Sequence, residues 1–209
     1  MSSDLVVFPC SASKNGARLS ATLKRTRVSD LVGVASRQLL EEGRRLAFQR
    51  RRTWIDQRSD LVQALALYTG NPYKVDEFRA QILRLLGGGT HCLILSGGYG
   101  LVRPEEPIHD YGAHMSVTAP VWRRRLPFIL DDYIRRNRIG RVFVGCSSVY
   151  RQVLGGAPWG RTVEVLWCVP KARRGEAALV AVPTRVGEAF VRLVNQGMEP
   201  GRDWQAELR

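Results

Sequence analysis

The chain has 209 residues, of which 44% are hydrophobic and 24% charged, so its composition excludes wholesale disorder. A chain of this length buries a core large enough to need no disulfide or metal staple. The net charge is +13, and 28 of the 32 basic residues are arginines. Because arginine binds phosphate through two parallel hydrogen bonds, this excess indicates a polyanionic partner, above all nucleic acid, although a GC-rich genome would produce the same bias.

The sequence contains no apolar run of about 20 residues and no basic-then-apolar leader, which predicts a cytoplasmic protein without a membrane partner. Cys10, Cys92, Cys146 and Cys168 are far apart and form no C-x₂-C pair, so we expect no metal. Each lies in or just after an apolar run, which favours small buried thiols in a reducing compartment. Cys10 and Cys146 stand at strand ends, where lining a site is the alternative.

Apolar runs and helical patterns alternate along the chain. Nearly continuous runs, typical of strands covered on both faces, are Leu5–Phe8, Cys92–Leu95, Val142–Val144 and Val163–Trp167, with Leu179–Val182 as a candidate fifth. The helical patterns are Ser29–Gln49, Val75–Leu86, Val121–Arg136, Ser148–Leu154 and Arg185–Gln196. The alternation predicts an α/β fold with three layers and a largely parallel central sheet. Neither a repeat nor a low-complexity linker divides the chain, so residues 1–209 are expected to form one domain.

A long basic connection, at about residues 18–60, is predicted to be a helical insert after the first strand. The predicted nucleic-acid-binding residues are Arg50, Arg51, Arg52 and Trp54 in this insert, Arg123, Arg124 and Arg125, and Lys171, Arg173 and Arg174. The second cluster continues through Arg135, Arg136, Arg138 and Arg141. A single cluster would be a solvated helix face. Three clusters with few acidic residues, and with Trp54, Trp122 and Trp159 nearby, resemble a phosphate-tracking surface with aromatic platforms.

Ligands of open parallel sheets bind beyond the carboxyl ends of the strands, so the residues after each predicted strand are candidates. Small hydroxyl or glycine residues follow three strands, where backbone N–H groups can approach a phosphate or sugar phosphate. The candidate binding residues at these ends are Ser11 and Ser13, Ser96, Gly98 and Tyr99, and Cys146 and Ser147. None of these loops is a P-loop or a G-x-G-x-x-G motif, so we expect no cofactor.

The segment from Ser96 to Gly112 contains the closest grouping of candidate catalytic side chains. A glycine-rich turn and two prolines lead to His109, Asp110 and Tyr111, the one place where these three residue types adjoin. Asp110 can activate water or stabilise a positive charge, and Tyr111 can stack on a base. The alternative is that Asp110 caps a turn and Tyr111 packs in the core. We predict Asp110, His109 and Lys14 as catalytic residues.

Two motifs stand at predicted strand ends, Cys10-Ser11-x-x-Lys14 and Leu95-Ser96-x-x-Tyr99-Gly100-Leu101 with a proline and a tyrosine downstream. A third, Tyr68-x-Gly70-x-x-Tyr73, precedes a predicted helix. Over about residues 5–150 the chain thereby resembles the YaaA-like family of small bacterial and phage proteins, mostly of unknown function. The resemblance implies an α/β core and DNA association, and more loosely the uracil-DNA glycosylase architecture. It also implies phage-defence settings in which modified bases are excised. The chain lacks the glycosylase Gly-Gln-Asp-Pro-Tyr motif and His-Pro-Ser loop, so no catalytic residue is carried over.

These features predict a DNA glycosylase-like enzyme that hydrolyses the N-glycosidic bond of a modified base, in phage defence or repair. An oxocarbenium-like sugar needs a carboxylate, for which Asp110 is the candidate, and an extruded base needs an aromatic platform, Tyr99 or Tyr111. Lys14 either binds a phosphate or forms a Schiff base with the sugar, which would add lyase activity. The alternatives are a non-catalytic DNA-binding protein of stress protection and a deoxyribosyltransferase-like enzyme acting on free nucleosides or nucleotides. The oligomeric state stays open.

Overall fold

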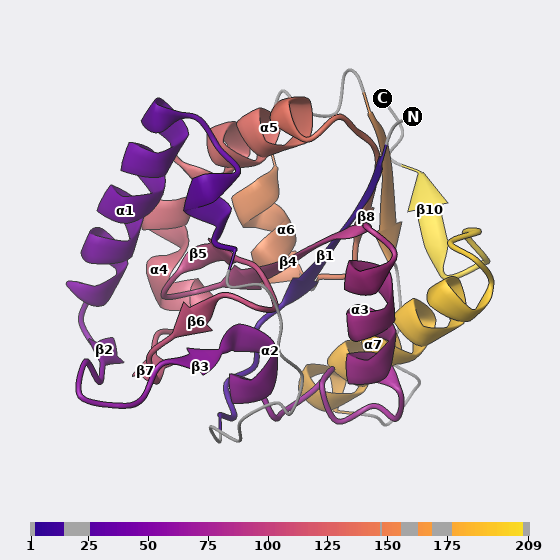
Figure 1. The fold of residues 1–209 in the computed structure, drawn as a ribbon. Helices are drawn as coiled ribbons and strands as arrows, with labels where there is room; N and C mark the ends of the chain where they lie inside the picture. The colour runs from indigo at the N-terminus through magenta and orange to yellow at the C-terminus, as the bar shows by residue number, and fades with distance from the viewer. Residues whose placement is uncertain (1–2, 15–25, 147, 156–162, 169–176, 207–209) are drawn as a thin grey trace.

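The computed structural model describes residues 3–14, 26–146, 148–155, 163–168 and 177–206, and a six-stranded, mostly parallel sheet forms its centre (Figure 1). Its four parallel strands are β1 (Ser3–Pro9), β4 (His91–Ser96), β8 (Ile139–Val144) and β9 (Glu164–Cys168). Short antiparallel strands, β5 (Gly100–Val102) and β10 (Trp204–Ala206), form the two edges of the order β10-β9-β8-β1-β4-β5. The four predicted strands and the mixed α/β class are therefore confirmed.

The α-helices of the described residues divide between two cores that β1 separates. They are α1 (Val34–Phe48), α2 (Ala64–Leu67), α3 (Phe78–Gly87), α4 (Met115–Trp122), α5 (Leu126–Arg136), α6 (Ser148–Leu154) and α7 (Ala178–Asn195). Leu5 and Val7 of β1 pack with apolar side chains of α1, α4, α5 and α6. The alternate residues Val6 and Phe8 pack with α2, α3 and α7, because successive side chains of a strand point to opposite faces.

One expected strand is a helix in the structure, and one expected helix is divided in two. The candidate fifth strand Leu179–Val182 is wrong, because these residues belong to helix α7. A short apolar run carries no period that separates a buried strand from a buried helix turn. The single helix expected at Val121–Arg136 is two helices, α4 and α5, because Pro127 occupies the first turn of α5 and disfavours continuous helix through the residue before it.

The predicted helix at Ser29–Gln49 is also shorter in the structure. A 3₁₀ turn, η1 (Val28–Asp30), comes first, and α1 begins at Val34 after an extended Gly33. Helix α3 begins three residues later than expected, whereas α6 has the predicted bounds. None of the helices in the described part of the chain is long and apolar enough to cross a membrane.

Two short antiparallel ribbons tie the predicted insert to the segment that contains His109. Strand β2 (Trp54–Ile55) pairs with β7 (Tyr111–Gly112), and β3 (Val62–Gln63) pairs with β6 (Pro107–Ile108). The Asp56 N–H also donates to the Asp110 carbonyl at 2.9 Å. Residues 54–63 therefore lie against residues 107–112 at one end of the molecule (Figure 1).

The order of the strands defines a crevice between β1 and β8. After β1 the chain leads to β4 on one side of it, and later crosses to β8 on the other side before continuing to β9. Strand order thus reverses between β1 and β8, which pair in parallel with Val7 opposite Val144. A reversal of this kind leaves the carboxyl ends of the two strands open to a ligand.

Candidate functional site

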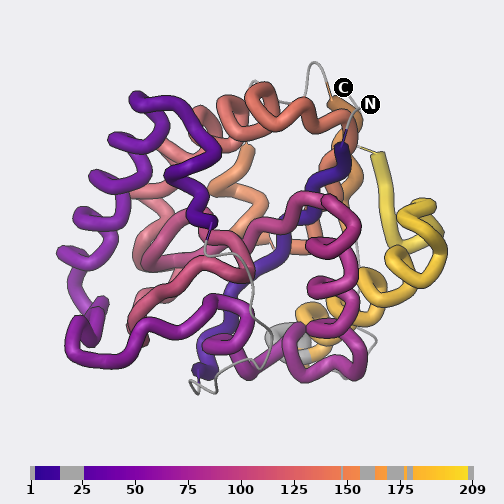
Figure 2. Tube along the Cα trace, viewed as in Figure 1, coloured from indigo at the N-terminus to yellow at the C-terminus, as the bar shows by residue number. Residues whose placement is uncertain are grey.

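A cavity of about 840 Å³ lies at the carboxyl ends of β1 and β8. Its lining comes from six parts of the chain: Pro9 to Lys14 at the end of β1, Arg52, Gly70 and Asn71, Gly112 to His114, Ser148 to Tyr150 in α6, and Val182, Pro183 and Val186 in α7. In Figure 2 the end of β1 and the α2 segment meet at the lower edge of the molecule, beside the first turns of α7. The size falls within the range of small-ligand sites.

The loop after β1 holds its shape through Ser11. The Ser11 Oγ accepts hydrogen bonds from the backbone N–H groups of Gly70, at 3.0 Å, and Ser13, at 3.2 Å. A Cβ at Gly70 would overlap this Oγ, so only glycine permits the approach. Ser11 is buried and Ser13 exposed, and both line the cavity. Ser11 therefore shapes the loop that carries Lys14.

Lys14 is held at the cavity wall. Its backbone forms a bridge with Tyr68, and its Nζ lies 4.3 Å from the centre of the Tyr111 ring and donates to the Ala12 carbonyl at 3.4 Å. Burial lowers the pKa of Lys14 below its ordinary value of 10.5, while the charges of Cys10 and Asp110 act in the opposite direction. The structure thus brings together Lys14, Ser11 and Ser13 at one cavity.

Cys10 and Tyr150 close the cavity between the two strands. The Cys10 Sγ lies 3.4 Å from the Tyr150 hydroxyl, and both side chains are half-buried. Burial raises the pKa of Tyr150 well above 10, so this phenol is neutral at physiological pH. Cys10 differs from the expectation of four buried thiols, whereas burial holds Cys92 and Cys168 neutral by raising the pKa of each to about 12.

Asp110 and His109 lie beside the cavity and not among its lining residues. The His109 Nδ1 is 2.9 Å from the Ser59 carbonyl, and the Asp110 N–H donates to the Ser59 Oγ at 3.1 Å. The Asp110 Oδ1 accepts the Tyr111 N–H at 2.7 Å. The Asp110 carboxylate therefore bonds to the backbone of its own neighbour, and its charge also acts on the Lys14 amine. The imidazole of His109 makes its contact with the predicted insert.

The glycine-rich turn after β4 belongs to the core, although it follows a strand end. Ser96 is fully buried, with its Oγ 2.7 Å from the Tyr111 hydroxyl and accepting the Tyr99 N–H at 3.0 Å. The Tyr111 hydroxyl is also 2.8 Å from that of Tyr68. Burial raises the pKa of Tyr111 and of Tyr68 well above 10, so the network consists of neutral hydroxyls. It supports the ring on which the Lys14 amine rests.

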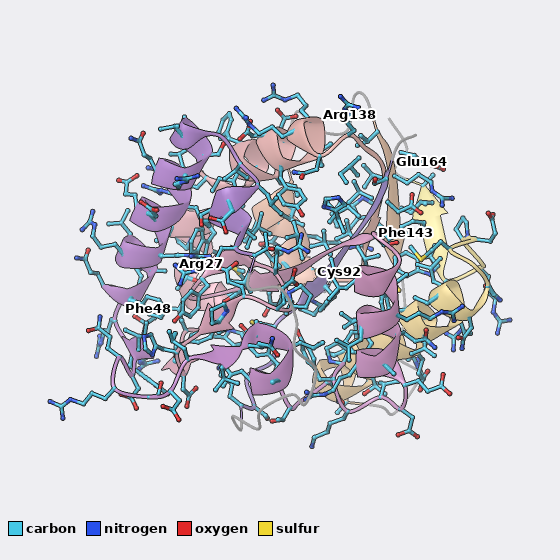
Figure 3. The ribbon with its side chains drawn as sticks, viewed as in Figure 1. Arg27, Phe48, Cys92, Arg138, Phe143 and Glu164 are labelled. Atoms are coloured by element: carbon cyan, nitrogen blue, oxygen red, sulfur yellow. The ribbon has the colours of Figure 1, made fainter. Side chains whose placement is uncertain are left out.

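Phe48 covers the same turn from the end of α1 (Figure 3). Its ring makes edge-on contacts with Tyr99 and Tyr111, at centroid distances of 5.4 and 5.9 Å. A Cβ at Gly98 would lie 2.7 Å from atoms of both Phe48 and Tyr111. The exposed fractions of Tyr99 and Tyr111 are 8% and 1%, so neither ring offers a free face to a base. Side chains from α1 and β7 therefore cover this strand end.

Cys146 follows β8 but points into the core, where its Sγ lies 3.9 Å from the Val7 carbonyl. Burial raises the pKa of its thiol strongly, which makes it chemically inert. Four further predicted residues, Ser147, Lys171, Arg173 and Arg174, lie outside the described residues, as does Trp159.

Among the described residues, the arginine that lines the cavity belongs to the predicted insert. Arg52 lines the cavity, with a left-handed backbone at φ 65°, and Arg50 and Arg51 are exposed. Trp54 is 53% exposed and its indole covers Gly112, where a Cβ would overlap the Nε1 atom. Arg50, Arg51, Arg52 and Trp54 are called the cavity-mouth group below. Arg52 lines the cavity, and Trp54 packs against Gly112, another of its lining residues.

The other described cluster is less uniform than its sequence predicts. Arg123 and Arg124 are exposed, but Arg125 pairs with Glu42 at 3.1 Å. Ion pairs also hold the later arginines: Arg135 with Asp131 and Arg136 with Asp132, both at 2.9 Å, and Arg141 with Asp4 at 2.7 Å. Figure 3 shows Arg138 at the top of the view, near Glu164 and the amino ends of the strands, opposite the cavity. The expected scarcity of ion-pairing acids is therefore wrong for this cluster.

Trp122 is not an aromatic platform, which corrects the sequence interpretation. It is fully buried, and its Nε1 donates to the Gly97 carbonyl at 2.7 Å. Its ring also packs against Gly43 and Gly100, where added Cβ atoms would lie 2.4–2.6 Å from it. The tryptophan stands next to an arginine cluster in sequence, but the helix turns its side chain inward.

Sequence reasoning missed several cavity residues. Tyr150, Asn71, Gly112 and His114 carry no motif of their own, and Val182, Pro183 and Val186 lie in an apolar stretch interpreted in part as a strand. The placement of Tyr150 after the third predicted strand was the one available signal. Among the described residues, no three His, Cys, Asp or Glu side chains group closely enough to hold a metal ion.

No known protein-family profile matches this chain, and no curated protein sequence is significantly similar to it.

Proposed function

We propose that this protein is a DNA glycosylase-like enzyme that hydrolyses the N-glycosidic bond of a modified base, with the base or its sugar seated in the cavity between β1 and β8. The observation that carries the proposal is the meeting of Lys14, Ser11, Ser13 and Arg52 at one cavity with the charge of Asp110 nearby. A carboxylate can stabilise the charged sugar, a guanidinium can bind the phosphate, and a hydroxyl can contact the edge of the base.

The chemistry assigns each group a role. Water adds to C1′ of the deoxyribose while the bond to the base breaks, and the base leaves with the bonding electrons and takes up a proton. Positive charge develops on the sugar, and the Asp110 carboxylate stabilises it. Arg52 holds a flanking phosphate, and the hydroxyl of Ser13 contacts the base edge. Tyr99 and Tyr111 support the site from the core instead of stacking on the base.

DNA is the proposed partner because the chain is strongly basic and an arginine lines the cavity. The chain carries a net charge of +13, and Arg52 of the cavity-mouth group lines the cavity. We extend the proposal to the rest of the sequence interpretation: a YaaA-like, cytoplasmic protein of phage defence or repair, with a three-layer fold and a basic insert. In this proposal the insert carries the cavity-mouth group, which contacts the DNA strand.

The test is incubation with DNA duplexes that each carry one modified base, followed by mass spectrometry of the released base and alkaline cleavage at abasic sites. We expect one class of modified base to be released, and Asp110→Asn to reduce the rate by on the order of 100-fold or more while DNA binding persists. Asparagine keeps the acceptor for the Tyr111 N–H and removes the charge. The exposed Asp76 provides the matched control, Asp76→Asn.

Equal release by wild type and Asp110→Asn would make Asp110 a turn residue and overturn its assignment. DNA binding without release from any duplex would overturn the enzyme and favour the non-catalytic DNA-binding alternative. The deoxyribosyltransferase-like alternative has one observation in its favour, because a cavity of about 840 Å³ accepts a free nucleotide whole. Base exchange on free nucleosides, without action on DNA, would establish that alternative.

A further inference from the structure

The amine of Lys14 stands in an environment suited to a nucleophile. It lines the cavity, rests 4.3 Å from the centre of the Tyr111 ring and makes one hydrogen bond of 3.4 Å to the Ala12 carbonyl. The backbone at Ser13 and Lys14 is anchored, because Lys14 bridges to Tyr68 and the Thr69 N–H donates to the Ser13 carbonyl at 2.9 Å. An anchored backbone and a supporting ring position the amine with little loss of side-chain entropy on reaction.

A second cation in the cavity, Arg52, can bind the phosphate in place of Lys14. Arg52 lines the same cavity, and its guanidinium stays charged and binds phosphate through a fork of N–H groups. Arginine cannot act as an amine nucleophile, whereas lysine can once it loses its proton. Burial favours that loss at Lys14, since it lowers the pKa of this amine.

We propose that Lys14 captures the aldehyde of an abasic deoxyribose as a Schiff base, so that the protein cleaves the strand at abasic sites. This rests on the proposed function only in that the cavity receives a nucleic-acid sugar. The substrate class is the ring-opened C1′ aldehyde of an abasic site in DNA, with its flanking phosphate against Arg52.

The step balances without a cofactor or oxidant. The neutral Lys14 amine adds to C1′, and the resulting carbinolamine loses water to form the protonated imine. A base then removes a proton from C2′, the C3′–O bond breaks, and the 3′ phosphate leaves with the bonding electrons. We assign this proton transfer to Asp110, whose charge acts on the Lys14 amine from beside the cavity. Water finally hydrolyses the imine, which restores the amine and releases the unsaturated aldehyde end.

The test uses the full chain and a DNA duplex with a preformed abasic site, so that no base has to be recognised. Sodium borohydride reduces any imine to a stable adduct, which gel electrophoresis separates and peptide mass spectrometry maps. We expect an adduct on Lys14, strand cleavage without borohydride, and loss of both by on the order of 100-fold or more in Lys14→Arg. The exposed Lys74 gives the matched control, Lys74→Arg, which should trap and cleave as the wild type does.

Three results would overturn the inference: an adduct mapped to another amine, unchanged trapping in Lys14→Arg, or weaker DNA binding of that variant with unchanged cleavage per bound duplex. The last would make Lys14 a phosphate contact. Thermal melting verifies that Lys14→Arg is folded, and Lys14→Gln serves as a second variant if it is not. Base release without trapping would support the proposed function and contradict the Schiff base on Lys14. Trapping on abasic DNA without base release would support the Schiff base and contradict the glycosylase activity.

Discussion

Lys14 shows how one side chain acquires a special chemistry from its surroundings. The chain contains four lysines among 32 basic residues, and Lys14 is the one that lines the cavity within the described residues. Desolvation disfavours the charged amine, and the carboxylate of Asp110 and the thiol of Cys10, when ionised, favour it. Because desolvation dominates, a larger share of Lys14 is neutral at a given pH than of an exposed lysine.

This balance predicts the pH dependence of Lys14 modification. With an acetylating reagent and peptide mass spectrometry, the rate at Lys14, normalised to its own plateau, should reach half its maximum at a lower pH than the rate at exposed Lys74. Asp110→Asn removes a charge that raises the pKa of Lys14, so the midpoint should fall further. A midpoint at or above that of Lys74 would show that the neighbouring charges outweigh burial.

At the scale of elements, the β2–β7 ribbon connects the predicted insert to the cavity. Trp54 lies opposite Gly112 in this ribbon, and Gly112 lines the cavity. The glycine is required by close approach, since the Trp54 indole occupies the space that a Cβ would take. The ribbon therefore fixes where the aromatic side chain of the cavity-mouth group stands relative to Lys14.

Gly112→Ala should displace the Trp54 indole and weaken DNA binding. If Trp54 stacks on a base, its loss costs about 1–3 kcal/mol of binding free energy, so Trp54→Ala should weaken affinity roughly 5- to 150-fold and Gly112→Ala by up to the same factor. Because Trp54 is more than half exposed, the melting temperature should change little. Gly87→Ala, where a Cβ meets nothing within 4 Å, is the control. Unchanged affinity in both ribbon variants would remove Trp54 from the interface.

The whole molecule carries its positive charge unevenly. Near the amino ends of the strands, Arg135, Arg136 and Arg141 are paired with aspartates, and exposed ion pairs of this kind contribute little to stability. At the other end, the exposed Arg50 and Arg51 stand near the cavity. The net charge alone therefore overstates how many arginines are available to a polyanion.

DNA affinity should fall steeply with salt, with a log–log slope of about −5 if roughly 6 phosphates are contacted. Arg51→Gln should reduce the magnitude of this slope by about one, because binding with one phosphate contact fewer releases about one counterion fewer. Arg135→Gln, in an ion pair with Asp131, should leave the slope unchanged. Fluorescence anisotropy over a salt series measures all three. A slope near zero would exclude nucleic acid as the partner.

The parallel strands were predictable because continuous runs such as Leu5–Phe8 and Val142–Val144 favour a buried strand without help from distant residues. The edge strands β5 and β10 were not, since three residues carry no readable period. The run at Leu179–Val182 is equally compatible with strand and helix, and packing decided for the helix. The ribbons pair residues about 45 to 58 positions apart, for which no local pattern exists.

By itself, the sequence determined the α/β class, the positions of four strands, and a candidate site after β1 that includes Ser11, Ser13 and Lys14. Only the tertiary structure decided which strand ends stay open. Phe48 and Tyr111 cover Gly98 and Tyr99, and Tyr111 also contacts Ser96, whereas the reversal of strand order leaves Cys10 and Tyr150 facing a cavity. Local patterning sets what each segment becomes, because backbone and side-chain preferences act over a few residues. Exposure, pairing and pKa depend on which distant segments pack together, as burial against the Tyr111 ring distinguishes Lys14 from Lys74.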